Sequence, residues 1–439
     1  MRVLVTGATG FIGRHVAASL IAAGHEVVIA ARDTARAQRI FPEQAFVACD
    51  FTQDLSVEAW RPRLEGIAAL VNCVGVLQPR RRATTEAVHV QATSALFDAC
   101  AAFGVRRVIH ISALGVETGI DLAYATSKLA ADQHLQGLDL DWTILRPSLV
   151  YTPAGSYGGT SMLRAQAALP LVLPLPGKGE QAFQPVFMDD LTEGIRRLLE
   201  QGKGLREIIP VTGPEPLSIR EILLRLRFWL GLGWAWTLPI PMMLMRGLAR
   251  LGDLFGAGPL TTTSLRMIEQ GNTAPPDAFV AATGLAPRRF IEVLAERPAH
   301  SQDRWHARLY FVRPALRVLL GLFWVASASV MLFGEPVYSE EVLSDPDFSV
   351  PEASFGLAEV VYLLALISGL LLVAGWRVRS VLTAQACVLT PALLGWWLYF
   401  LFLVVVVGWQ FVWPSLMLLL GSSLVFVATL IALAFEDGR

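Results

Sequence analysis

The sequence predicts an α/β fold with a doubly wound parallel sheet and a small additional lobe, followed by an all-α bundle of four transmembrane helices. Strand-like and helical segments alternate over the first part of the chain, and a glycine-rich turn follows the first strand. Of the 439 residues, 54% are hydrophobic and only 17% are charged, whereas about a quarter of an average soluble protein is charged. Part of the chain is therefore expected to lie in lipid.

The predicted strands are short, apolar and rich in β-branched residues, with helical segments between them. This alternation is typical of parallel strands joined by crossover helices. We expect the strands at residues 3–6, 26–31, 68–74, 107–112 and 141–146. Three domains follow from the changes in composition: a sheet domain at residues 1–150, a substrate or lid lobe rich in glycine and proline at 151–300, and a membrane domain at 301–439.

Four apolar stretches predict the membrane domain, at residues 316–333, 357–376, 381–407 and 411–435. Each is near or above the roughly 20 residues that span a bilayer. Arginines precede the first stretch and separate the second from the third, whereas residues 334–356 carry acidic residues and no basic ones. Because positive charge marks cytoplasmic loops, we expect a multi-pass protein of the inner cell membrane, with the sheet domain and both termini in the cytoplasm. The first strand begins at the start of the chain, so no signal peptide is expected.

A glycine-rich turn, TGATGFIG at residues 6–13, follows the first strand and opens a helix. Glycines allow the tight turn, a close approach of the backbone to a pyrophosphate, and the packing of the helix on the strand. The helix N-terminus adds amide donors for the phosphates. We therefore predict a Rossmann-type domain that binds a dinucleotide through Gly7, Thr9, Gly10, Phe11, Ile12 and Gly13.

The end of the second strand bears on the choice of cofactor. An acidic residue there would bind the ribose 2′-hydroxyl of NAD, and an arginine would meet the 2′-phosphate of NADP. The strand closes on Ala31, followed by Arg32 and Asp33. Arg32 favours NADP, and Asp33 keeps NAD open as the alternative. Asp50, after the strand at residues 45–48, is placed either to reach the adenine amino group or to act as a turn carboxylate.

Three side chains form a candidate catalytic set. Ser112 ends a strand, and Tyr124 and Lys128 are separated by one helical turn, so that both lie on one helix face. A tyrosine that shuttles a proton near neutral pH needs a pKa below its usual value of about 10. An adjacent ammonium group lowers it and can hold the ribose hydroxyls. The serine hydroxyl would polarise a substrate carbonyl.

Five motifs occur in order over residues 1–153: TGATGFIG, VNCVGV, HISALGV, YATSK and LRPSLVYTP. Together they resemble the extended or atypical short-chain dehydrogenase/reductase family, which is NAD-dependent epimerase/dehydratase-like. Within it, the sequence is most similar to the group that contains the nucleotide-binding accessory subunit of respiratory complex I. GSYGGTS (155–161), QPVFMDDL (184–191) and PLTTTSLRMIEQGN (259–272) extend this resemblance to about residue 290. The four-span region resembles the DoxX-like membrane domain, mainly in its hydropathy.

The resemblance implies roles for residues that match the family motifs. Gly7, Gly10 and Gly13 would bind the pyrophosphate, and Ser112, Tyr124 and Lys128 would form the catalytic triad. Asn72, Val74 and Gly75 would line the cofactor cleft, and Pro147 the nicotinamide side. The family often has an asparagine where this chain has His89, which leaves a complete proton relay in doubt. The complex I relative also implies that the fold can bind a nucleotide without turnover.

Other features narrow the range of functions. A net charge of −1 gives no reason to expect a nucleic-acid partner. The four cysteines lack metal spacing, no metal site is expected, and all seven histidines precede the first apolar stretch, which excludes a histidine-ligated haem within the bundle. Glu359, an acid inside a predicted span, is either functional or close enough to the outer loop to reach water. Residues 242–254 form an amphipathic pattern that would pack on its own domain or lie on a membrane surface.

From the sequence we expect a membrane-anchored NADP-dependent oxidoreductase, with NAD as the alternative cofactor. It would transfer hydride between the nicotinamide and a small hydrophobic carbonyl, quinone-like or lipid-like substrate. The expected partners are the lipid bilayer and, as an alternative, a membrane protein complex. Two other functions remain open: a non-catalytic NAD(P)H-binding scaffold or redox sensor of a membrane complex, and an epimerase or dehydratase of the sugar-nucleotide type.

Overall fold

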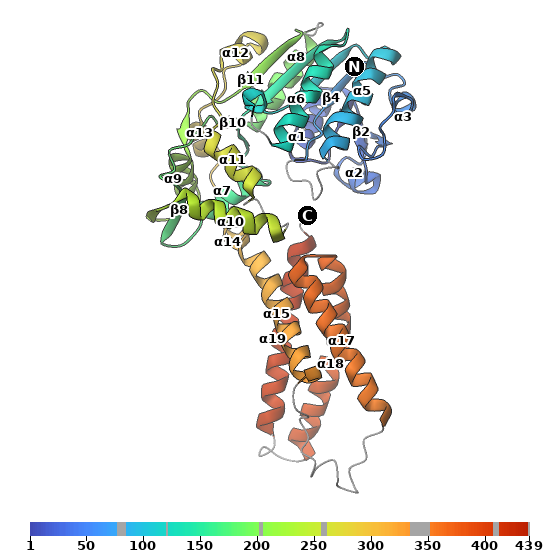
Figure 1. Ribbon diagram of the computed structural model, residues 1–439, viewed down its shortest axis with the longest axis vertical. Coiled ribbons are helices and arrows are strands. Elements are labelled where there is room, and N and C mark those ends of the chain that lie inside the picture. Colours follow the sequence, from blue (N-terminus) through green and yellow to red (C-terminus); the bar gives the residue numbers. More distant parts are fainter. Residues whose placement is uncertain are drawn as a thin grey trace. The chain divides into compact units, whose positions relative to one another are not determined.

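The computed structural model describes residues 1–76, 85–119, 122–201, 205–255, 261–333, 352–406 and 412–437. The chain divides into two compact units, residues 1–307 and residues 308–439 (Figure 1). The first unit is a Rossmann-like α/β domain, and the second is helical.

A seven-stranded sheet forms the centre of the first unit, in the order β11-β6-β5-β4-β1-β2-β3. Every pair of neighbouring strands in it is parallel. The strands are β1 (Arg2–Thr6), β2 (Glu26–Ala31), β3 (Ala45–Ala48), β4 (Ala69–Asn72), β5 (Arg107–Ile111), β6 (Asp141–Pro147) and β11 (Glu207–Val211). The parallel sheet that the alternating pattern predicts is therefore confirmed.

Helices cover both faces of the sheet and bury two separate apolar cores. Along β1, Val3 and Val5 face one core and Leu4 faces the other, as the alternation of side chains along a strand requires. The first core is shared with α1 (Phe11–Ala22), α2 (Thr34–Ile40) and α8 (Met188–Glu200). The second is shared with α3 (Val57–Trp60), α5 (Ala92–Phe103) and α6 (Ala123–Gln136). Three short helical turns, η1 (Arg61–Arg63), the π-helical η2 (Ala87–Gln91) and η3 (Val116–Thr118), complete this part.

Strand β11 was not among the strands expected from the sequence. It pairs with β6 at one end of the sheet and contains Pro210, whose missing N–H is tolerated at such an edge. Because β11 follows residue 150, the sheet crosses the predicted boundary between the sheet domain and the lobe. The division of the first unit at residue 150 stays a prediction.

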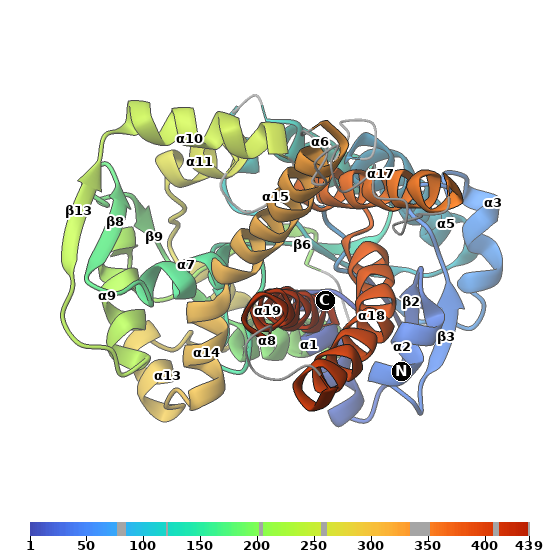
Figure 2. The same cartoon turned by 90° about the horizontal axis from the view of Figure 1, so that it is seen from below.

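Many of the remaining residues of the first unit gather around a third apolar core that includes Phe187, Leu223 and Phe290, whereas Phe279 belongs to the first core. In Figure 2, β8, β13 and α9 lie at one end of this unit and β3 at the other. The strands are β7 (Val150–Tyr151), β8 (Val172–Pro176), β9 (Ala182–Phe183), β10 (Val186–Phe187), β12 (Leu217–Ser218) and β13 (Trp236–Ile240). The helices are α7 (Gly159–Ala167), α9 (Ile219–Trp229), α10 (Met242–Phe255), α11 (Thr262–Gln270), α12 (Asp277–Thr283), α13 (Phe290–Glu296) and α14 (Ser301–Leu309).

The second unit contains four long helices in its described residues: α15 (Val312–Phe333), α17 (Glu352–Ala374), α18 (Val378–Val406) and α19 (Val412–Asp437). Two stretches in the described part of the chain are long and apolar enough to cross a membrane, Val312–Phe333 and Val378–Leu398. The four-span bundle stays a proposal. Helix α18 continues through Pro391 and Gly395. The acidic segment expected outside the membrane lies largely outside the described residues.

Helices α15 and α17 meet at a pair of glycines. A Cβ atom added to Gly321 would lie 2.8 Å from the carbonyl oxygen of Gly369 and 2.7 Å from Cγ2 of Val373. A Cβ atom added to Gly369 would lie 2.7 Å from the carbonyl oxygen of Gly321 and 2.9 Å from Cγ2 of Val325. The two backbones are therefore in direct contact, as small residues permit.

Candidate active site

The glycine-rich turn links β1 to α1, and two of its glycines have no room for a side chain. Gly7 has a φ of +69°, and a Cβ atom there would lie 2.9 Å from the backbone carbonyl of Cys73, just beyond β4. A Cβ atom at Gly13 would lie 2.7 Å from the carbonyl carbon of Gly7. Glycine at both positions therefore lets the first turn of α1 close onto the β1 turn.

The N-terminus of α1 has no side chain that caps it. Gly10 is the N-cap residue, and the first turn contains no acidic residue. The Gly10 amide donates to the Gly7 carbonyl over 2.9 Å, which closes the turn. An uncapped helix start with exposed glycine backbone suits a phosphate group. Thr9, Phe11 and Ile12 are half-buried around this turn, so the residues present fit a dinucleotide pyrophosphate.

Arg32 is exposed directly after β2, at the place expected to contact the ribose. The Asp33 carboxylate accepts a hydrogen bond from the Arg36 amide over 2.8 Å and so caps α2. The Asp50 carboxylate accepts from both the amide (2.9 Å) and the hydroxyl (2.8 Å) of Thr52. Although burial opposes the effect, these hydrogen bonds lower the pKa of Asp50. The geometry at Asp50 favours the turn-carboxylate alternative.

Lys128 connects the ends of two neighbouring strands. Its Nζ donates to the carbonyl oxygens of Val74, after β4, and Ile111, at the end of β5, each over 2.9 Å. The side chain is buried, and this burial lowers the pKa of Lys128 to about 8 despite the opposing charge of Asp132. Gly75 lies next to the Lys128 side chain. A Cβ atom added to Gly75 would lie 3.5 Å from Nζ of Lys128, in van der Waals contact with it.

Tyr124 lies one turn before Lys128 on α6 and is half-buried. Burial, with a smaller contribution from the charge of Asp132, raises the pKa of Tyr124 to about 12. The sequence-based expectation of a lowered pKa is therefore not met in this structure. The physical reason is that the Lys128 ammonium group is directed at two carbonyl oxygens, and burial of the phenol dominates.

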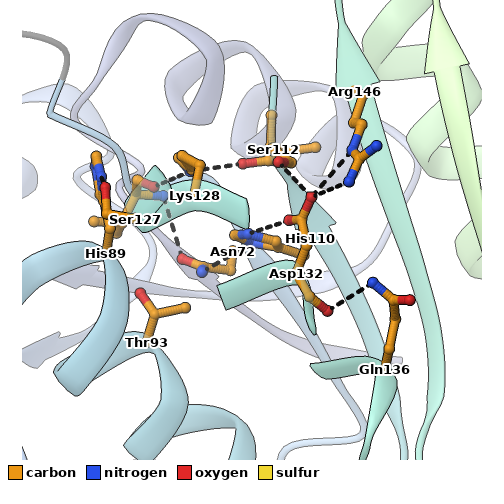
Figure 3. Close-up of polar contacts among 12 residues, drawn as sticks. Asn72, His89, Thr93, His110, Ser112, Ser127, Lys128, Asp132, Gln136 and Arg146 are labelled. Atoms are coloured by element: carbon orange, nitrogen blue, oxygen red, sulfur yellow. Dashed lines mark hydrogen bonds and ion pairs between the residues drawn. The ribbon is translucent and has the colours of Figure 1, made fainter. Parts of the chain in front are cut away.

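Ser112, immediately after β5, points toward a buried carboxylate (Figure 3). Its hydroxyl donates to Oδ2 of Asp132 over 2.9 Å. The same oxygen accepts from Nε (3.0 Å) and Nη2 (2.9 Å) of Arg146 on β6. His110 completes the cluster, with its Nε2 3.5 Å from Oδ1 of Asp132. The structure thus places Ser112 and Lys128 at the same strand end, and no hydrogen bond between Ser112 and Tyr124 occurs within the described residues.

Asp132 and Arg146 were not identified from the sequence. Tyr124, Lys128 and Asp132 are spaced by four residues each, which places them along one face of α6. That spacing is the signal that could have revealed Asp132. Arg146 lies within the LRPSLVYTP motif. Its contact with Asp132 could not be inferred from the motif, because it depends on the pairing of β6 with β5.

His89 lies in η2 and is neutral, because burial and the nearby Lys128 lower its pKa to about 3. Its Nε2 accepts from the Val76 amide over 2.8 Å, so Nδ1 carries the hydrogen and donates to the Ser127 hydroxyl at 2.9 Å. Ser127 in turn donates to the Tyr124 carbonyl over 3.1 Å. The His89 ring also meets the Tyr124 ring edge-on, with centroids 5.6 Å apart. His89 therefore fastens the segment after β4 to α6.

Asn72 is fully buried at the end of β4 and connects three strands (Figure 3). Its Oδ1 accepts from the Thr6 hydroxyl over 2.6 Å and from the Val74 amide over 3.2 Å, and its Nδ2 lies 3.2 Å from Nδ1 of His110. The Asn72 side chain therefore contributes to the predicted cofactor cleft by holding the ends of these strands together. Pro147 ends β6, and its carbonyl accepts from the Leu114 amide over 3.1 Å.

Of two cavities in the first unit, only the smaller one lies beside a predicted site residue. A small one of about 20 Å³ lies beside Tyr124 and is lined by Leu114, Met267, Gln270 and Asn272, among others. This volume holds about one water molecule. A larger cleft of about 580 Å³ is lined by residues of α1, α8 and the segment after α12, and contains none of the predicted site residues.

The fold and the glycine turn define the class of the first unit, a Rossmann-type α/β domain. Comparison with known proteins then shows which family and which proteins this domain is similar to. Residues 3–209 match the NAD dependent epimerase/dehydratase family. A chloroplastic epimerase family protein of Arabidopsis thaliana is 25% identical over 245 residues, which cover 51% of this chain and 69% of that protein. The 40 kDa subunit of mitochondrial NADH-ubiquinone oxidoreductase of Neurospora crassa is 22% identical over 223 residues, which cover 50% of this chain and 57% of the subunit.

Among solved structures, the UDP-glucose 4-epimerase of Thermus thermophilus in complex with NAD shares the fold. The TM-score is 0.51 at 22% identity, over 70% of this chain and 99% of that one. The N-terminal unit is therefore a Rossmann-like α/β domain that is similar to the NAD dependent epimerase/dehydratase family over residues 3–209, with similar proteins among complex I subunits. The DoxX-like resemblance of the C-terminal unit stays a prediction.

Proposed function

We propose that this chain is a membrane-anchored NAD(P)-dependent reductase of a hydrophobic carbonyl, quinone-like or lipid-like substrate. The observation that carries the proposal is the position of Lys128. Its ammonium group joins the ends of β4 and β5 and lies one helical turn from Tyr124. In a parallel sheet, ligands bind at the carboxyl ends of the strands, and this is where both side chains lie.

The cradle formed by Gly7, Gly13 and the uncapped start of α1 would hold the pyrophosphate of the cofactor, and Arg32 would favour NADP over NAD. When bound, the nicotinamide supplies the hydride that reaches the carbonyl carbon. Tyr124 donates its proton to the carbonyl oxygen, so that the carbonyl becomes an alcohol. With a pKa of about 12 the Tyr124 hydroxyl is protonated at neutral pH, so it carries the proton that reduction requires. Efficient transfer of that proton would require the bound cofactor to bring this pKa closer to neutral pH.

Ser112 would orient the substrate oxygen. Its hydrogen is directed to Asp132, so its lone pairs remain to accept a hydrogen bond from the product hydroxyl. To donate to a carbonyl instead, the Ser112 hydroxyl must rotate away from Asp132. Lys128 would hold the ribose hydroxyls and keep positive charge near the tyrosine.

The substitution Tyr124→Phe tests the proposal, because it removes only the hydroxyl. We expect NADPH binding to be retained and carbonyl-dependent NADPH oxidation to fall by about 10²–10⁴-fold. The assay uses proteoliposomes with a panel of quinones, apolar ketones and aldehydes. Full activity of the variant on a substrate that the wild type accepts would rule out the mechanism.

A scaffold or redox-sensor function has specific support. The cavity beside Tyr124 is about 20 Å³, Ser112 is bonded to Asp132, and the pKa of Tyr124 is raised. All three features fit a domain that binds a nucleotide without turning over a substrate. NADPH binding by both wild type and Tyr124→Phe, with no turnover by either, would favour this function. An epimerase or dehydratase reaction on a sugar nucleotide is the alternative that the relatives suggest, and a panel of nucleotide sugars with NAD tests it.

A further inference from the structure

Large apolar side chains are exposed on β13 and on the helix that follows it. Trp236 is 66% exposed and Met243 is 83% exposed. Where several large apolar side chains are exposed on neighbouring elements, they mark a candidate interaction site. We call this area the β13–α10 surface, formed by Trp234, Trp236, Leu238, Met243, Leu248 and Leu251.

The apolar side of α10 faces away from the protein. Ala249 is fully buried, whereas Leu248 and Leu251 are exposed. With about 100° between successive residues, Leu251 lies on the side of the helix opposite Ala249, and Met243 and Leu248 lie on the two flanks of that side. Of the two alternatives left open for residues 242–254, packing on its own domain is observed through the buried Ala249, while the apolar side of the helix remains exposed.

The polar side of α10 is attached to α11, which runs beside it (Figure 2). Arg246 forms an ion pair with Glu269 of α11 at 3.0 Å. The Asp253 carboxylate accepts from the Thr262 amide at the start of α11 over 3.1 Å. These contacts fix which face of α10 remains open, and the open face is the apolar one.

Two observations favour a lipid bilayer as the partner. The first is the pair of exposed tryptophans, Trp234 and Trp236, whose rings meet edge-on at 4.6 Å. Indole rings with one apolar side and one polar N–H concentrate at the membrane–water interface. Such a pair beside an amphipathic helix is typical of a segment that lies in the interface plane.

The second observation is the length of the connecting chain. Helix α14 is fixed within the first unit through the buried Ala307 and the ion pair of Asp303 with Arg164. Only Tyr310 and Phe311 separate α14 from α15, which is one of the two candidate membrane spans. At about 3.5 Å per residue, this link keeps the first unit within reach of any bilayer that α15 crosses.

Helix α11 also forms a wall of the cavity beside Tyr124. Met267 and Gln270 line this cavity, and Gln270 is hydrogen-bonded to the hydroxyl of Thr118 in η3. One side of α11 therefore faces the candidate active site and the other side carries α10. An apolar substrate dissolved in lipid would meet the β13–α10 surface before it meets Tyr124.

We propose that the β13–α10 surface lies in the interfacial layer of a lipid bilayer, and that a lipid-soluble molecule reaches the cavity at Tyr124 along α11. The second part rests on the proposed function. The first part requires neither a cofactor nor turnover, so the two can fail separately.

The test places an environment-sensitive fluorophore on Leu248→Cys in the full chain, reconstituted in vesicles of mixed zwitterionic and anionic lipids. Cys73 and Cys387, which are not buried, are first replaced by alanine. The matched control is Glu58→Cys, at an exposed position on α3. We expect lipids with a nitroxide near the headgroup to quench the label at position 248 and not the label at 58, and aqueous iodide to do the reverse.

Two outcomes would overturn the docking surface. Quenching of the label at position 248 by iodide and not by lipid would show that the surface faces water. Protection from both quenchers would show that protein covers it, for example a second copy. For the route to Tyr124, Met267→Cys should react faster with a long-chain maleimide dissolved in the bilayer than with a charged one. Faster reaction with the charged reagent would exclude entry from the lipid.

Discussion

At the scale of single residues, the site depends on how Asp132 distributes its hydrogen bonds. Its carboxylate is fully buried and receives Ser112 and the Arg146 guanidinium. Burial raises the pKa of Asp132, and the Arg146 bonds oppose this effect. Arg146 also forms an ion pair with the partly exposed Glu117 at 3.0 Å, so removing the charge of Asp132 leaves the guanidinium with one of its two carboxylate partners.

The variant Asp132→Asn is therefore expected to lower the free energy of unfolding by about 1–3 kcal/mol, because the buried Arg146 loses one counter-charge and keeps only the partly exposed Glu117. Thermal unfolding of the first unit, followed by circular dichroism, measures this effect. The same substitution at the exposed Asp139, which pairs with Arg106 and Arg206, serves as the control and should leave the midpoint unchanged. Equal midpoint temperatures of unfolding for the two variants would contradict the stabilising role proposed for the Asp132–Arg146 ion pair.

Lys128 predicts a pH dependence of cofactor binding. Its pKa of about 8 means that the ammonium form predominates below that pH and is lost above it. If the ammonium group holds the ribose, NADPH affinity should fall as the pH rises from about 7 to about 9. Calorimetric titration across this range measures it, and Lys128→Met should bind more weakly at pH 7 and show no such fall. A flat profile for the wild type would argue against this role.

Arg32 carries the prediction on cofactor choice. It is exposed after β2, and Asp33 is engaged in capping α2. Arg32→Ala should weaken NADPH binding by about 10-fold or more and leave NADH binding nearly unchanged, because only NADPH has a 2′-phosphate. Tighter binding of NADH than NADPH by the wild type would remove the basis for the NADP preference.

At the scale of elements, the motif spacing and the alternation of strands and helices were enough to predict the parallel sheet and the glycine turn. Local sequence could not show which partner Ser112 selects, since Asp132 and Arg146 come from α6 and β6 and meet only when the sheet forms. Strand β11 was missed because it is short and contains Pro210. The pKa of Tyr124 depends on burial, which spacing along a helix does not report.

The start of α1 gives a prediction at this scale. Gly13→Ala would push a methyl group into the Gly7 carbonyl and displace the first helical turn. Overpacking of this kind costs about 1–3 kcal/mol, so NADPH affinity should fall by about 10-fold or more. Gly247→Ala on α10, where nothing lies within 4 Å, is the matched control and should bind as the wild type does. Unchanged affinity in the Gly13 variant would mean that the turn does not carry the cofactor.

At the scale of the whole molecule, the proposed topology can be tested by accessibility. In a version without the native cysteines, Ser344→Cys in the acidic segment should react with an impermeant maleimide in intact cells. Ser380→Cys, near the start of α18, should react only after the cells are permeabilised. The opposite labelling pattern would place the nucleotide-binding unit outside the cytoplasm and overturn the proposed orientation.

The glycine contact between α15 and α17 has a consequence for how the second unit tolerates change. Glycine is the smallest residue, and both contact positions already carry it. Val373 of α17 closes the space beside Gly321, and Val325 of α15 closes the space beside Gly369. A bulkier residue at Gly321 therefore has no compensating substitution at Gly369. Sliding one helix along the other by a turn would press a valine against the opposite backbone. The pair should consequently behave as a single rigid hairpin, locked in one register.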